Sequence, residues 1–243
     1  MKTTRRLCLF IFLLAVLHFP SFATWSIIVI DPKTKEIGIA GASCTSSVYG
    51  IGAIVPGKGA IVVQAMSNGM ARLQGFKMIM DGATPAAILE EIRKPNYNPE
   101  QQQYAILCMN DIKHPATYTG TKTTSHNGTL TANGISVQGN TLTHPEELQA
   151  IFDAAVKAQK DSLPIQDILM LALEAGAKSG GDKRCGERKA SSAFVTVSKP
   201  GEVEKHWLNL VIYGNDDHTN AVEALRQKFD DWKSKEKTAI RTP

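Results

Sequence analysis

The chain has little net charge and no run of basic residues. Its first 23 residues hold three of the 27 Lys and Arg residues and none of the 23 acidic residues, so 24 basic residues stand against 23 acidic ones after residue 23. A chain so close to neutral lacks the electrostatic attraction that binds nucleic acid or an anionic membrane. We therefore expect no nucleic-acid partner and, after residue 23, no membrane partner.

Long apolar runs and metal-binding clusters are missing as well. After residue 23 no apolar stretch is long enough to span a bilayer. Asp216, Asp217 and His218 could be metal ligands, but three adjacent residues rarely converge on one ion and no partner cluster is visible. An acidic pair at this place is more typical of a helix N-terminus. The sequence therefore predicts no metal site, and it requires no organic cofactor.

Cysteine is scarce, with four residues in the chain and three after residue 23. Cys108 lies in an apolar stretch, residues 104–109, so we expect its thiol to be buried and inert. Cys44 and Cys185 lie in loops of small polar residues, which makes them the better candidates for a disulfide in an exported protein. A cysteine protease built on Cys44 is the weaker interpretation, because it would need one of the scattered histidines to be brought close by the fold.

The one long apolar segment is N-terminal and has the form of a secretory signal. Three cations precede an uncharged apolar run over residues 7–17, and the small residues Ser21 and Ala23 stand three and one before a predicted cut. The run is too short for a comfortable transmembrane helix, so an uncleaved anchor is the weaker alternative. We expect residues 1–23 to be removed, leaving residues 24–243 as a single domain of a periplasmic or secreted bacterial protein.

Cleavage after Ala23 would give Thr24 a free α-amino group. A threonine hydroxyl is a poor nucleophile unless a base takes its proton, and an α-amine with a pKa near ~8 can be that base on the same residue. Signal peptidases accept many residues after the cut, so a threonine there is also compatible with no catalytic role. However, an apolar β-rich stretch follows Thr24 directly, which would hold the hydroxyl at the end of a core strand rather than on a frayed terminus.

The order of predicted elements indicates the fold class. Blocks of strands alternate with blocks of helices, which argues against a doubly wound parallel sheet. The pattern favours an α+β protein, a four-layer αββα sandwich of antiparallel sheets flanked by helices. Strands are predicted at residues 25–30, 36–42, 51–55, 60–65, 102–109, 116–118, 134–138, 192–198 and 206–213. Helices are predicted over residues 68–80, between Thr84 and Pro95, after a capping box at Thr143 and Glu146, after Ser162, and around residues 222–232.

Two polar segments could carry chemistry beside Thr24. Asn140 ends a predicted strand just before a helix, where its amide could donate to a developing oxyanion, although bonding to local backbone is the commoner role. Gly180 and Gly181 would allow backbone to approach a ligand closely, and Asp182 could orient an amine or a neighbouring cation. A helix C-cap followed by a solvated loop is the alternative for this second segment.

Several stretches spread over residues 24–193 resemble the bacterial family known as domain of unknown function 1028. Members of that family look like N-terminal-nucleophile hydrolases in fold, so the resemblance implies the same αββα sandwich. The matching stretches are Thr24-Trp25-Ser26-Ile27 with Asp31-Pro32, Gly38-Ile39-Ala40-Gly41-Ala42-Ser43, Gln64-Ala65 with Asn68, Val137-Gln138-Gly139-Asn140, Glu174-Ala175-Gly176, Gly180-Gly181-Asp182 and Ser191-Ser192-Ala193.

The resemblance implies an exported hydrolase of a small amide or peptide that uses Thr24 as nucleophile, without metal or cofactor. It suggests Asn140 near the oxyanion and Ser43 or Asp182 near the α-amine. It also supports a disulfide between Cys44 and Cys185, because exported relatives look similar at both positions. The residues expected to contribute to substrate binding are Gly180, Gly181, Gln138 and Asn68.

The chain departs from the superfamily pattern in one respect. Many superfamily members carry a Lys or Arg near the nucleophile, and the sequence shows no obvious equivalent, since Lys58 lies in a predicted hairpin turn. This departure favours the alternative function, a non-catalytic exported protein that binds a small ligand on the same scaffold. Superfamily relatives often form dimers, so a homodimer is left open, although no residue of this chain indicates one.

Overall fold

A computed structural model of the chain describes residues 24–202, 204–214 and 219–241. The predicted signal at residues 1–23 lies outside the described residues, as do Asp216, Asp217 and His218. No helix within the described ranges combines the length and apolar character needed to cross a membrane.

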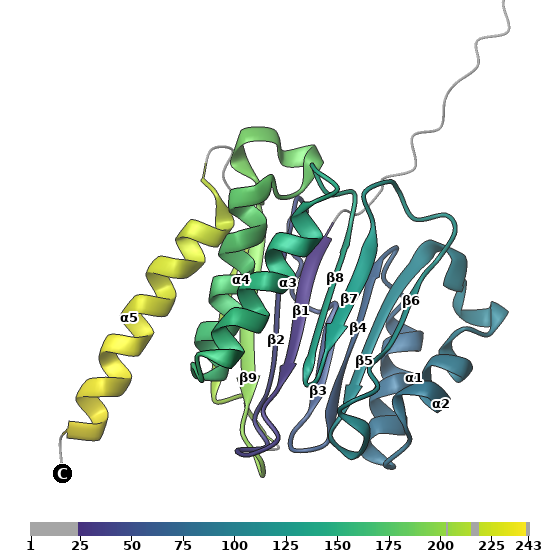
Figure 1. Cartoon of the computed structure of the whole chain (residues 1–243), viewed down its shortest axis with the longest axis horizontal. Coiled ribbons are helices and arrows are strands. Elements are labelled where there is room, and N and C mark those ends of the chain that lie inside the picture. The colour runs from purple at the N-terminus through teal and green to yellow at the C-terminus, as the bar shows by residue number, and fades with distance from the viewer. Residues whose placement is uncertain (1–23, 203, 215–218, 242–243) are drawn as a thin grey trace, which may run out of the picture.

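The described strands form two antiparallel sheets that lie face to face (Figure 1). The larger sheet contains, in spatial order, β10 (Leu208–Ile212), β9 (Ser192–Ser198), β2 (Ile37–Ser43), β1 (Thr24–Ile30), β8 (Ile135–Asn140) and β7 (Gly128–Ala132). The smaller sheet contains β3 (Gly52–Val55), β4 (Gly59–Ala65), β5 (Gln102–Cys108) and β6 (Ala116–Thr119).

Helices cover the outer face of each sheet, as Figure 1 shows. The larger sheet carries α3 (Glu147–Lys160), α4 (Ile165–Ser179) and α5 (Ala221–Arg241), and the smaller sheet carries α1 (Gly69–Met80) and α2 (Pro85–Ile92). Short 3-10 helices lie at Pro95–Tyr97, Pro99–Gln101, Met109–Asp111 and Lys183–Arg188. Three separate apolar cores fill the spaces between these layers. The αββα prediction is therefore confirmed.

Strand β1 lies inside the larger sheet and is buried on both faces. Trp25, Ile27 and Val29 belong to the core beneath the helices, whereas Ile28 and Ile30 belong to the core between the sheets. Burial on both faces explains why the strand is apolar throughout instead of alternating with polar residues. The predicted start of the mature chain is thus the first residue of a fully covered strand.

Two local predictions fail for the same physical reason. Strand β7 was not predicted, because its sequence is short and polar and it gains its place only by pairing with β8 at the sheet edge. The capping box at Thr143 and Glu146 is wrong, since α3 begins at Glu147 without a side-chain cap. The Thr143 hydroxyl instead donates to the carbonyl oxygens of Gly180 and Gly181, at 3.1 and 3.0 Å. Contacts between distant segments override the local pattern in both cases.

Two other predicted helix starts are confirmed. Thr84 Oγ1 accepts a hydrogen bond from the Ala87 N–H, and Pro85 occupies the first turn of α2. Asn68, predicted as the first residue of a helix, is the N-cap of α1. Both caps are made within a few residues of sequence, so local chemistry is enough to find them.

Gly176 of α4 lies directly against the Trp25 ring of β1, and this contact gives a test of the packing. A Cβ at Gly176 would lie 2.5 Å from Trp25 Nε1 and 2.8 Å from Trp25 Cδ1. We expect Gly176→Ala to lower the free energy of unfolding by about 1–2 kcal/mol, since overpacking costs about 1–3 kcal/mol and alanine's helix propensity returns about 0.5–1 kcal/mol. Urea unfolding measures the change. Gly69→Ala in α1 is the control, because the atom nearest to a Cβ at Gly69 would be 3.9 Å away. If Gly176→Ala were as stable as the native sequence, the packing described would be contradicted.

Candidate active site at the end of the larger sheet

Four polar residues on neighbouring strands stand side by side at one end of the larger sheet. Thr24 on β1 pairs with Asn140 on β8 and with Ser43 on β2, and Ser43 pairs with Ser192 on β9. Directly opposed residues of a sheet share a face. Ser26, two residues after Thr24, bonds to the smaller sheet, so alternation directs this polar row, defined as Asn140, Thr24, Ser43 and Ser192, between the sheets. The row is almost completely buried.

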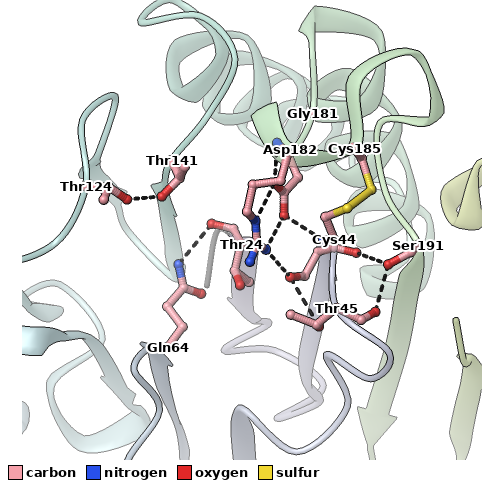
Figure 2. Close-up of polar contacts among 12 residues, drawn as sticks. Thr24, Cys44, Thr45, Gln64, Thr124, Thr141, Gly181, Asp182, Cys185 and Ser191 are labelled. Atoms are coloured by element: carbon pink, nitrogen blue, oxygen red, sulfur yellow. Dashed lines mark hydrogen bonds and ion pairs between the residues drawn. A yellow bond between two sulfur atoms is a disulfide. The ribbon is translucent and has the colours of Figure 1, made fainter. Parts of the chain in front are cut away.

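Gln64 reaches across from β4 and holds the first and third residues of β1. Its Oε1 accepts a hydrogen bond from Ser26 Oγ at 2.6 Å, and its Nε2 donates to the carbonyl oxygen of Thr24 at 3.2 Å. Figure 2 shows Thr24 between Gln64 on one side and Cys44 and Asp182 on the other. The candidate nucleophile is therefore tied to the smaller sheet through its own carbonyl oxygen and through the side chain of Ser26, two residues further along the strand.

The orientation of the Asn140 amide follows from its neighbours. Gln103 Nε2 contacts the carbonyl oxygens of Gly128 and Gly139 at 3.1 and 3.0 Å, so this atom must be the donor nitrogen. Gln103 Oε1 therefore faces the other way and accepts from Gln64 Nε2 at 2.7 Å and from Asn140 Nδ2 at 3.3 Å. Asn140 Oδ1 is left buried, with no hydrogen-bond partner among the described residues.

Asp182 joins the loop after α4 to the end of β2. Its carboxylate is fully buried and accepts the Cys44 N–H at 2.6 Å. Arg184 donates to the same carboxylate from its main-chain N–H at 3.0 Å and from its guanidinium at 3.0 and 2.7 Å. Hydrogen bonds to an ionised group are the stronger kind, which makes this a firm anchor beside Ser43. Ser191 adds a link at the same end of β2. Its hydroxyl donates to the Thr45 carbonyl at 2.8 Å (Figure 2).

Arg184 places a cation beside the polar row, which no local sequence pattern indicated. Its Nη2 lies 3.4 Å from Ser43 Oγ, and Ser43 is opposite Thr24. The predicted disulfide between Cys44 and Cys185 is confirmed, with 5.5 Å between the two Cα atoms. This pairing was also the signal that could have located Arg184, because the residues preceding the two cysteines are Ser43 and Arg184.

Asn68 and Gln138, both predicted to contribute to binding, are occupied by structural contacts. Asn68 Oδ1 accepts from the N–H groups of Met70 and Ala71, and its Nδ2 donates to the Tyr97 carbonyl at 2.9 Å. Gln138 Nε2 donates to Ser26 Oγ at 2.6 Å and its Oε1 accepts from Ser136 Oγ at 3.0 Å. Both amides hold elements in place, and a binding role for either stays a prediction.

Gly180 and Gly181 pack against the start of α3. Gly180 has φ 143°, and a Cβ there would lie 2.7 Å from Thr143 Cβ and 3.0 Å from Glu147 Oε2. Gly181 has φ 71°, and its carbonyl accepts the Thr143 N–H at 3.1 Å. The two glycines therefore allow this loop to lie directly on α3 and to deliver Asp182 to Cys44.

The main chain is strained on both sides of the polar row. Thr141, which follows Asn140, has φ 53°, and Ala65, which follows Gln64, has φ 65°. A positive φ is a genuine outlier for a β-branched residue. Thr141 is held there partly by a contact between its hydroxyl and that of Thr124 (Figure 2). Such outliers concentrate at functional sites, where surrounding contacts maintain them.

Comparison with known proteins supplies the family. Residues 24–225 match the model described as Family of unknown function (DUF1028). The chain belongs to the DUF1028 family. A crystal structure of a protein from Silicibacter pomeroyi, assigned to the same family model, superposes with a TM-score of 0.71 and 22% sequence identity over 86% of this chain and 88% of that chain. No curated protein matches. At this identity the neighbour shows the fold alone.

The DUF1028 chain also buries a carboxyl group at the start of α3. Glu147, the first residue of α3, is fully buried, and neither carboxyl oxygen has a hydrogen-bond partner among the described residues. Burial raises its pKa to about 8. The backbone N–H groups of Thr143, His144 and Gly181 lie close enough to oppose this rise without making a well-aligned hydrogen bond, and the charge of Asp182 raises the pKa further. At neutral pH Glu147 is therefore mostly protonated. The described residues contain no group of three His, Cys, Asp or Glu side chains placed to hold a metal.

The raised pKa of Glu147 predicts a stability that falls with rising pH. The folded state keeps a proton up to about pH 8 that the unfolded chain releases near pH 4.5, so this contribution is complete below pH 4.5 and is lost as pH rises through 8. Glu147→Gln cannot ionise. Its free energy of unfolding relative to the native sequence should therefore rise between pH 5 and pH 9, by a few kcal/mol at most.

Urea unfolding at several pH values measures this difference. Glu146→Gln, at the exposed neighbouring position, is the control and should show no such trend. If the difference for Glu147→Gln stays constant from pH 5 to pH 9, Glu147 is not a neutral buried acid.

The disulfide and the buried third cysteine predict a pattern of thiol reactivity. A DUF1028 chain that starts at Thr24 and is purified without reductant should show no reactive thiol when folded, one in denaturant, and three after reduction. Cys108 accounts for the one, because it is 2% exposed and burial raises the pKa of its thiol to about 12. Alkylation followed by mass spectrometry counts the thiols, and three in denaturant without reductant would rule out the Cys44–Cys185 bond.

Proposed function

We propose that this protein is an exported amide hydrolase whose nucleophile is Thr24 after removal of residues 1–23. The observation that carries the proposal is the polar row, which sets the Thr24 side chain between Ser43 and Asn140 on the inner face of the larger sheet. Two atoms of this row, Asn140 Oδ1 and Ser192 Oγ, are buried and have no hydrogen-bond partner among the described residues. Buried polar atoms without partners need an explanation, and a ligand that bonds to them is one.

Two further findings support export and a start at Thr24. The family match begins at Thr24, the residue that the predicted cut would expose. The Cys44–Cys185 disulfide suits an oxidising compartment such as the periplasm or the extracellular space. The substrate would be a small amide or peptide.

The proposed reaction proceeds through an ester on Thr24. The α-amine takes the hydroxyl proton as Thr24 Oγ bonds to the carbonyl carbon of the amide. The resulting oxyanion collapses, the carbon–nitrogen bond breaks, and the α-amine passes its proton to the departing amine. A water molecule then attacks the ester with the α-amine again as base, which releases the carboxylic acid and restores the Thr24 hydroxyl.

The neighbours of Thr24 have distinct parts in this proposal. Asn140 turns its Nδ2 to Gln103 and presents Oδ1, an acceptor, which suits the N–H groups of an α-amine better than an oxyanion. We therefore assign Asn140 to the amine and leave the oxyanion to backbone N–H groups. Arg184, bound to Asp182 and next to Ser43, adds a positive charge near the amine and favours its neutral, proton-accepting form.

Covalent labelling tests the proposal, and two forms of the protein are compared. One begins at Thr24 with a free amine, and the other carries one extra glycine before Thr24. A β-lactone that acylates N-terminal nucleophiles should modify Thr24 in the first form only, as located by peptide mass spectrometry. Thr24→Ser should also be labelled, whereas Thr24→Ala should not.

Hydrolysis supplies the second readout. Against a library of acyl amides and short peptides, the free-amine form should release product, and Thr24→Ala should be slower by on the order of 10³-fold or more. Equal labelling of the two forms, or no turnover by any form, would support the alternative of a non-catalytic ligand-binding protein. A native mature chain that begins elsewhere than Thr24 would end the proposal.

A further inference from the structure

A cavity lies away from Thr24, where the edge of the smaller sheet meets β2 and β9. Its volume is about 190 Å³. Apolar side chains form part of its walls, and four polar side chains reach it from different parts of the chain. The residues that matter for the argument are Tyr49, Gly52, Arg72, Phe194, Thr196 and His206.

Arg72 is a half-buried cation without an anionic partner. Among the described residues its guanidinium makes one hydrogen bond, to Ser67 Oγ at 3.4 Å, and no ion pair. Burial lowers its pKa, and arginine nonetheless stays charged at neutral pH. Removing an unpaired charge from water is costly unless a counter-charge is supplied.

The position of Arg72 in its helix adds to this cost. It lies in the first turn of α1, which contains no acidic residue. A helix N-terminus carries partial positive charge, so a cation there is unfavourable and an anion is favourable. Arg72 is thus a cation in an unfavourable position, and an anion bound in the cavity would offset its charge.

Two other groups at the cavity can donate or accept hydrogen bonds. His206 Nδ1 is bonded to Ser198 Oγ at 2.5 Å, which leaves Nε2 as the ring nitrogen for a ligand. Tyr49 Oη accepts from Asn209 Nδ2 at 3.1 Å, so its proton remains available for donation. Together with Arg72 they give the cavity a cationic, donor-rich side.

Two aromatic rings contribute to the apolar part of the cavity wall. The rings of Tyr49 and Phe194 pack edge to face, with centroids 5.6 Å apart. Gly52 lets Ile39 pack directly against the main chain of β3 at the wall, since a Cβ there would lie 2.8 Å from Ile39 Cδ1. A cavity of about 150 Å³ accepts benzene, so this one has room for one ring with a small polar group.

We propose that this cavity binds a small organic carboxylate with a single flat apolar body, whose carboxylate pairs with Arg72 and whose body lies against Tyr49 and Phe194. Arg72 offers the forked donor geometry that matches a carboxylate. The site is separate from the polar row, and the proposal stands whether or not Thr24 is a nucleophile.

Isothermal titration of the chain that begins at Thr24 tests this. Benzoate is the probe, benzamide is its neutral counterpart of nearly equal shape, and inorganic phosphate is an anion without an apolar body. Benzoate should bind at least tenfold more tightly than either. Arg72→Met should weaken benzoate binding at least tenfold, and Arg72→Lys should weaken it less, because it keeps the charge but loses the fork.

Arg93→Met is the matched control, since Arg93 is exposed on α2 and lies over the Tyr118 ring instead of the cavity. It should leave the benzoate affinity unchanged. Circular dichroism checks that each variant folds, and if Arg72→Met does not fold, Tyr49→Ala replaces it and should also weaken benzoate binding. The proposal would be overturned by equal binding of benzoate and benzamide, or by phosphate binding as tight as that of benzoate. An unaltered benzoate affinity in the folded Arg72→Met variant or its Tyr49→Ala replacement, or no binding heat up to about 10 mM benzoate, would overturn it as well.

Discussion

The structure depends on burying polar side chains between two sheets without leaving them unpaired. A buried amide or hydroxyl without a hydrogen bond costs more free energy than most single contacts supply. Gln64 and Gln103 meet this requirement from the smaller sheet, and Ser26 and Gln138 meet it from the larger one. The resulting chain of hydrogen bonds ties β1 to both sheets, so the position of Thr24 follows from satisfying these groups.

The same requirement explains how the side-chain amides of Gln103 and Asn140 are oriented and where the chain of hydrogen bonds ends. Main-chain carbonyl oxygens, which can only accept, set Gln103, and Gln103 in turn sets Asn140. The chain ends at Asn140 Oδ1, and the polar row contains a second unpaired atom in Ser192 Oγ. These unpaired atoms lie beside an otherwise satisfied hydrogen-bond network and near the strained residue Thr141. Such departures from the most stable local arrangement are typical of sites that bind a ligand.

A second anchor holds the same sheet end from the other side. Asp182 bonds to the Cys44 N–H and to Arg184, and the disulfide from Cys44 to Cys185 closes a long loop around this contact. A covalent bond and a buried ion pair next to each other limit how far Ser43 can move relative to β9. Arg72 presents the contrasting case, a charge that the described part of the fold leaves without a counter-charge.

Much of the fold was readable from the sequence, because it rests on local chemistry. Continuous apolar runs marked the buried strands, Thr84-Pro85 marked the start of α2, and two cysteines in small polar loops marked the disulfide. Only the tertiary structure decided which polar residues meet. The alternation of side chains along a strand predicts which face of the sheet each side chain occupies, but it does not predict which strand lies next to that strand. The register that pairs Thr24 with Ser43 and Asn140 therefore had no local signal in the sequence.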